Sequence, residues 1–92
     1  MAVLTDSAIQ AALANLPGWK RNGLAIERTF EFGDFKQTMA FVNSVADAAE
    51  LANHHPDIDI RYNKVRLALV THDAGGITQK DFDLAAAADK LC

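Results

Sequence analysis

The sequence predicts an α+β domain in which helices pack on one face of a four-stranded antiparallel sheet. Apolar residues recur at helical spacing in three segments, and they alternate with polar residues in two pairs of shorter segments. Each pair of alternating segments is joined by a tight turn, and strands joined by hairpins form antiparallel sheets. The expected order is helix, two strands, helix, two strands, helix.

Length and composition fit a single domain spanning residues 1–92. Half of the residues (50%) are apolar, which suits one hydrophobic core in a chain of this length. The formal net charge is -3, from nine basic and twelve acidic residues, so direct nucleic-acid binding is not expected. The start has neither a positively charged flank nor a long apolar run, and we expect a cytoplasmic protein without a membrane anchor.

The first helix is expected over residues 5–16, because Pro17-Gly18 stops the pattern there. Its apolar stripe consists of Ile9, Ala12, Leu13 and Leu16. Apolar and polar residues then alternate over residues 24–32, which predicts a half-buried strand. A short strand around Trp19–Arg21 is expected to pair with it across Asn22-Gly23, a sequence typical of hairpin turns.

A long helix is expected from Asp34 to about Asn53, because Asp34 followed by Gln37 resembles a capping box. The face predicted to enter the core carries Phe35, Met39, Val42, Val45, Ala46, Ala49 and Ala52. Core packing is the preferred interpretation of this face over cofactor binding.

A second hairpin and a last helix complete the predicted fold. The two strands carry alternating apolar residues, and the turn between them is expected at Asn63-Lys64. These residues are Ile58, Ile60 and Tyr62 in one strand, and Val65, Leu67, Leu69 and Thr71 in the other. Gly75-Gly76 breaks the pattern, and Thr78 is expected to cap a helix that runs to about Leu91.

All three histidines lie between positions 54 and 72, which points to a shared site. Glu50 and His54 stand four residues apart at the end of the long helix, so we expect Glu50 to contact and orient His54. His55 precedes Pro56, which turns the chain out of the helix. If the strand that ends at His72 returns to this neighbourhood, three imidazoles line one cleft and can move protons near neutral pH.

Each histidine also has a plain structural interpretation. His54 suits a solvated helix end, His55 a loop, and His72 a polar strand end. Metal binding is the rival functional interpretation, but neighbouring histidines rarely reach one ion and the only cysteine is Cys92. We therefore expect no metal and no cofactor. The sequence has no Gly-rich phosphate loop, nucleophile elbow or dinucleotide fingerprint.

Seven residues at fixed spacings carry a family resemblance across about a third of the chain. They form the run Glu50-x3-His54-His55-Pro56-x5-Tyr62-x9-His72-x8-Asp81. The run resembles the signature of the pterin-4a-carbinolamine dehydratases, and the expected order of helices and strands matches the fold of that family. One position departs from the family pattern, because Ile58 stands where an aromatic residue is common, so we expect no stacking there.

The resemblance implies a hydro-lyase that removes water from 4a-hydroxytetrahydropterin during tetrahydropterin recycling. It implies that His54, His55 and His72 surround the carbinolamine carbon, with His54 accepting a proton and the other two on the hydroxyl side. Glu50 would orient His54 or bind a polar pterin edge, Asp81 would support the site, and Pro56 would shape the chain exit. Trp19 and Tyr62 are expected to pack in the core or sheet rather than stack on the pterin.

The resemblance also implies partners and leaves rival functions open. It implies a homo-oligomer, dimer or tetramer, and an aromatic amino acid hydroxylase as metabolic companion. The alanine-rich runs Ala46–Ala49 and Ala85–Ala88 are compatible with close contact between helices of different subunits. The main alternative is a partner-binding or assembly module without catalysis. A weaker alternative is a related protein that acts on a different pterin, for instance in molybdenum-cofactor metabolism.

Overall fold

The computed structural model describes residues 2–92 and has the element order predicted from the sequence. The elements are α1 (Asp6–Leu13), β1 (Lys20–Asn22), β2 (Ala25–Glu31), α2 (Phe35–Ala52), β3 (Asp57–Arg61), β4 (Lys64–Leu69), a short 3-10 helix η1 (His72–Ala74), and α3 (Gln79–Asp89). The strands form one antiparallel sheet in the order β1-β2-β4-β3. Within residues 2–92, no helix combines the length and apolar character needed to cross a lipid bilayer.

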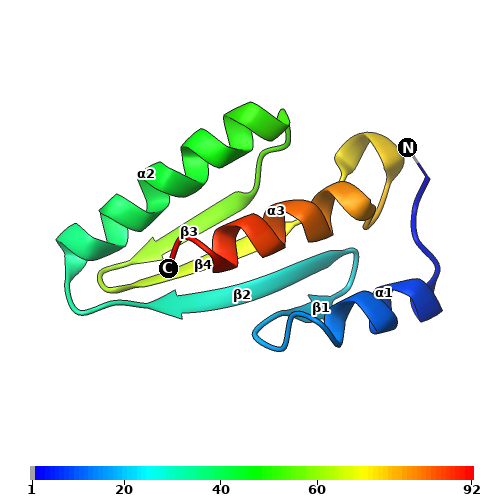
Figure 1. Cartoon of the computed structure of the whole chain (residues 1–92), viewed down its shortest axis with the longest axis horizontal. Coiled ribbons are helices and arrows are strands. Elements are labelled where there is room, and N and C mark those ends of the chain that lie inside the picture. The colour runs from blue at the N-terminus through cyan, green and yellow to red at the C-terminus, as the bar shows by residue number, and fades with distance from the viewer. Residues whose placement is uncertain (1) are drawn as a thin grey trace.

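The two faces of the sheet have opposite character, which explains the alternating sequence pattern. Val65 pairs with Phe30, and Leu69 pairs with Ile26, so these four buried side chains share one face. The helices pack on this face (Figure 1), which confirms the predicted fold class. The opposite face is charged: Arg66 forms ion pairs with Glu27 and Asp59 there.

Helices α2 and α3 lie side by side over the sheet (Figure 1) and contact each other directly. The buried faces of both helices carry small residues, because Ala49 of α2 and Ala85 and Ala88 of α3 are all at most 1% exposed. Small side chains allow two helix axes to approach closely. Three of the alanines considered for subunit contacts therefore pack inside the chain instead.

The buried stripe of α2 is rotated from the predicted one. The side chains that enter the core are Thr38, Phe41, Val42, Val45 and Ala49. Phe35, Ala46 and Ala52, which were expected on this face, are exposed. A threonine fits the stripe because its hydroxyl donates to the Asp34 carbonyl at 2.9 Å, which satisfies the buried polar group.

Two other boundaries differ from the sequence prediction. Helix α1 ends at Leu13, and the chain then tightens into turns that bond residues three apart up to Leu16. The β3–β4 turn uses Tyr62 and Asn63, because Arg61 already pairs with Lys64. Tyr62 has a positive φ of 54° and is 66% exposed, so it packs in neither the core nor the sheet. Trp19 is buried, as expected.

Candidate functional site

The end of α2 determines where His54 and His55 point. Asn53 adopts the left-handed conformation, with φ 50° and ψ 43°. Its N–H donates to the Glu50 carbonyl (3.2 Å), while the His54 N–H donates to the Ala49 carbonyl (3.1 Å). These two bonds form a Schellman motif, in which the chain reverses direction immediately after the helix. His54 is thereby turned toward the protein interior and is only 9% exposed.

The predicted contact between Glu50 and His54 is therefore wrong. Spacing by four residues places two side chains together only while the helix continues through both, and the left-handed Asn53 interrupts it. Glu50 pairs instead with His55, through Oε2 and Nε2. This pair is open to solvent, since the two side chains are 75% and 59% exposed.

His54 is held by Asp81, a fully buried carboxylate in the first turn of α3. His54 Nε2 lies 2.5 Å from Asp81 Oδ1. Asp81 Oδ2 accepts from the Thr78 N–H (2.9 Å) and from the Thr71 hydroxyl (2.9 Å). A carboxylate only accepts hydrogen bonds, so this set of donors places the His54 hydrogen on Nε2.

The opposite ring nitrogen of His54 is therefore available as a proton acceptor when the imidazole is neutral. Nδ1 makes no hydrogen bond within residues 2–92. Within residues 2–92, every fully buried side-chain nitrogen or oxygen has a hydrogen-bond partner. Because Nδ1 has no such partner, it is in contact with solvent. Asp81 thus acts both as the capping-box partner of Thr78 and as the carboxylate that orients His54.

His72 approaches the other two histidines from the opposite wall. It begins η1, just after the chain leaves β4 and Thr71 forms an isolated bridge with Gly76. The His72 side chain is exposed and makes no hydrogen bond within residues 2–92. It is therefore held by the backbone of η1 and has no side-chain role in the described fold.

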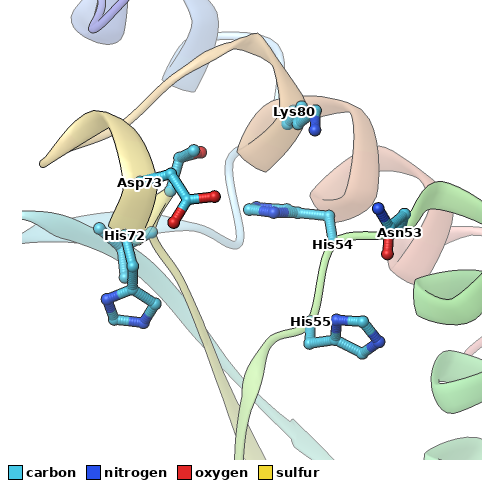
Figure 2. A pocket seen from close by; sticks show the side chains of 8 residues that line it. Asn53, His54, His55, His72, Asp73 and Lys80 are labelled. Carbon is cyan, nitrogen blue, oxygen red and sulfur yellow. The ribbon is translucent and has the colours of Figure 1, made fainter. Parts of the chain in front are cut away.

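One cleft of about 250 Å³ brings the three histidines together (Figure 2). Its walls are formed by Asn53, His54, His55, Val70, Thr71, His72, Asp73 and Lys80. Of the predicted supporting residues, Glu50 and Asp81 do not line the cleft themselves, but each contacts a histidine that does. Pro56 lies between α2 and β3, where the chain leaves the helix, and does not line the cleft.

Sequence reasoning missed Asp73 and Lys80, which also line the cleft. Each directly follows or precedes a residue of the predicted site, Asp73 after His72 and Lys80 before Asp81. That adjacency was the only signal in the sequence. The cleft therefore offers proton donors, proton acceptors and one charge of each sign, an arrangement suited to acid/base chemistry on a polar ring. Within residues 2–92, no group of three His, Cys, Asp or Glu side chains has the geometry to hold a metal ion.

Comparison with known proteins points to one family. The family model described as pterin 4 alpha carbinolamine dehydratase matches residues 2–91. A protein from Acidobacterium capsulatum with the provisional name pterin-4-alpha-carbinolamine dehydratase is 65% identical over 99% of both chains. A protein of the same provisional name from Thermomicrobium roseum is 56% identical over 92% of this chain and 91% of its own.

Two solved structures are also similar. A transcriptional coactivator/pterin dehydratase from Brucella melitensis superposes with a TM-score of 0.94, at 35% identity over 97% of each chain. A pterin dehydratase-like protein identified as a RuBisCO assembly factor in the alpha-carboxysome has a TM-score of 0.65 at 26% identity. That match covers 79% of this chain and 84% of the other.

Proposed function

The chain belongs to the pterin 4 alpha carbinolamine dehydratase family, and we propose that it removes water from a 4a-hydroxytetrahydropterin to give the quinonoid dihydropterin. The observation that carries this proposal is the meeting of His54, His55 and His72 in one cleft. In this proposal the product is then reduced again, so the enzyme serves tetrahydropterin recycling after an aromatic amino acid hydroxylase.

The reaction needs two proton transfers. The C4a–O bond breaks and the hydroxyl leaves as water after it receives a proton. Removal of a proton from ring nitrogen N5 lets the nitrogen electron pair form the C4a=N5 double bond. Positioned imidazoles can perform both transfers near neutral pH, and neither transfer changes an oxidation state.

The surroundings of the histidines support a division of roles. His54 is buried against Asp81 with Nδ1 free to accept, so we assign it the removal of the ring proton. His55 and His72 are exposed at the cleft, and we assign them to the hydroxyl side. Glu50 Oε2 contacts His55 Nε2, so this carboxylate holds the imidazole in place beside the cleft.

A non-catalytic role is the second candidate, because one similar structure is described as a RuBisCO assembly factor. A shared fold does not by itself establish a shared activity. The three histidines distinguish the two candidates, since assembly through an outer surface does not require imidazoles that converge in one cleft.

The test is the dehydration rate of enzymatically generated 4a-hydroxytetrahydropterin, followed by ultraviolet absorbance. We expect the wild-type chain to accelerate the spontaneous reaction and His55→Ala to lose on the order of 100-fold of that acceleration. Gln10→Ala, on the exposed surface of α1, is the matched control and should keep it. A folded wild-type chain that gives only the spontaneous rate would refute the proposal in favour of a binding role.

A further inference from the structure

Thr71 joins the two walls of the cleft. It immediately precedes His72, and its backbone closes the turn that contains η1. The Thr71 N–H donates to the Gly76 carbonyl (3.0 Å), and the Thr71 carbonyl accepts from the Gly75 N–H (3.0 Å). Figure 2 shows His72 at η1 and His54 on the segment that follows α2. The backbone of Thr71 therefore holds the wall of the cleft that carries His72.

The Thr71 hydroxyl reaches the opposite wall through Asp81. It donates to Asp81 Oδ2 (2.9 Å), and the other oxygen, Oδ1, lies 2.5 Å from His54 Nε2. Thr71 is only 8% exposed and Asp81 is fully buried, so the bond between them is shielded from bulk water. Two hydrogen bonds thus link the residue that precedes His72 to the ring of His54.

The direction of each hydrogen bond in this network can be assigned. A carboxylate only accepts, so the single hydrogen of the Thr71 hydroxyl points to Asp81. The Thr78 hydroxyl, 2.7 Å away, must then donate to Thr71. It accepts in turn from the Lys80 N–H (3.3 Å). The three donations all run toward the carboxylate that holds His54, and hydrogen bonds aligned in this way strengthen one another.

Two donors on Oδ2 keep the Asp81 carboxylate from rotating. The torsion about the Cβ–Cγ bond of an aspartate is broad, so one hydrogen bond does not fix the plane of the carboxylate. The Thr78 N–H (2.9 Å) and the Thr71 hydroxyl come from different segments and both bind Oδ2. Oδ1 is thereby kept turned to His54. Without the Thr71 hydroxyl, Oδ2 retains only the Thr78 N–H.

We propose that Thr71 is a positioning residue that sets how His54 and His72 stand relative to each other; this inference rests on the proposed function. Its backbone carries His72, and its hydroxyl fixes the carboxylate that orients His54. The two proton transfers use these two walls, so a hydroxyl that touches no reacting atom affects both. The hydroxyl is committed to Asp81 and Thr78 and does not serve to bind the substrate.

Thr71→Val tests this assignment, because valine keeps the branched shape and loses only the hydroxyl. In the dehydration assay we expect kcat to fall on the order of tenfold, because the two histidines are no longer held in register. KM should change by less than about twofold, since the hydroxyl does not bind the substrate. Thr71→Ser retains the hydroxyl and should keep kcat within about threefold of the wild type. A Thr71→Val variant with the wild-type kcat would overturn the assignment.

Thr38→Val is the matched control for the loss of a buried threonine hydroxyl. Thr38 is fully buried, and its hydroxyl donates to the Asp34 carbonyl (2.9 Å), away from the cleft. This variant should lower the midpoint of urea denaturation, as Thr71→Val does, but keep the wild-type kcat. An equal loss of kcat in both variants would reduce Thr71 to a structural residue and contradict the proposal.

Nitrogen NMR of the imidazoles tests the positioning without requiring turnover. At alkaline pH, where imidazoles are neutral, the wild type should carry the His54 hydrogen on Nε2. Thr71→Val should move the His54 resonances and leave those of His55, which contacts Glu50, unchanged. Unmoved His54 resonances would overturn the inference. A wild type that passes this test yet gives only the spontaneous dehydration rate would contradict the proposed function and leave the positioning intact.

Discussion

At the scale of single residues, the two carboxylates beside the histidines differ in what they contribute. Asp81 is completely buried and accepts from three groups on three segments of the chain. Glu50 is largely exposed and contacts only His55. Removing a buried acceptor strands its donors, whereas an exposed pair is screened by water. Removing the Asp81 carboxylate should therefore lower stability far more than removing the Glu50 carboxylate.

Asp81→Asn should destabilise the protein. The amide of asparagine presents a donor to at least one group that now donates to Asp81, which costs on the order of 3 kcal/mol. Urea denaturation followed by circular dichroism measures this change. The dehydration rate should fall too, because His54 loses the partner that fixes its ring.

Two other variants serve as controls for the stability loss expected of Asp81→Asn. Asp83→Asn removes an exposed carboxylate from the same helix and should change stability by less than about 0.5 kcal/mol. Glu50→Gln breaks the exposed pair with His55 and should cost less than about 1 kcal/mol. An Asp81→Asn variant as stable as Asp83→Asn would contradict the role assigned to the buried carboxylate.

Sequence reasoning named the three histidines and Asp81, but it paired Glu50 with the wrong histidine. Glu50 contacts His55, and His54 contacts Asp81. Glu50 was expected beside His54 because helical spacing places residues four apart together. The structure ends the helix one residue earlier, at Ala52, and the left-handed Asn53 redirects His54 to Asp81. Asparagine is among the residues that adopt this conformation most readily, so the signal was present in the sequence. The positions of Asp73 and Lys80 on the wall of the cleft had no comparable signal.

At the scale of elements, the C-terminus of α2 is the joint that builds the site. Asn53→Ala should destabilise the fold by about 1 kcal/mol, because a Cβ without a polar side chain is disfavoured at φ 50°. Asn53→Gly should be close to neutral, since glycine adopts this conformation without strain. Urea denaturation of the two variants provides the comparison. Equal stability of the alanine and glycine variants would show that the turn is not under this constraint.

Element order was predictable because local patterns determine it. Alternation in β2 and β4 follows directly from a sheet with one buried and one charged face. The face of α2 was less predictable, because Thr38 occupies a buried position by bonding its hydroxyl to Asp34. A pattern that sorts residues only into apolar and polar assigns a threonine to the exposed face. Tyr62 is a second example, because its apolar ring suggested a strand position, whereas its positive φ places it in the turn.

At the scale of the whole molecule, Asp89 connects the last helix to Trp19, just before β1, and to Arg28 of β2. Its Oδ1 accepts from Trp19 Nε1 (2.9 Å) and from Arg28 (2.7 Å), joining the end of α3 to the first hairpin. Asp89→Ala should lower stability on the order of 2 kcal/mol, because both partners are part-buried and lose an acceptor. Thermal unfolding measures the loss. An unchanged melting temperature would show that this connection contributes nothing.

Self-association is the second expectation at this scale. The sheet ends in two outer strands, β1 and β3, and α2 carries a leucine, Leu51, that is 91% exposed. Small domains commonly cover such features with further copies of themselves. Light scattering after size-exclusion chromatography should therefore give a multiple of the 10.0 kDa chain mass. A monomer mass at every concentration would contradict this expectation.

The central claim is that the cleft works through its three histidines, and His72 tests it most directly. Its side chain is exposed and makes no hydrogen bond within residues 2–92, so His72→Ala should leave folding unchanged. The measurement is the dehydration rate of 4a-hydroxytetrahydropterin with this variant and with the wild type. We predict that the folded variant loses on the order of 100-fold of the acceleration. A variant that dehydrates the pterin as fast as the wild type would contradict the claim.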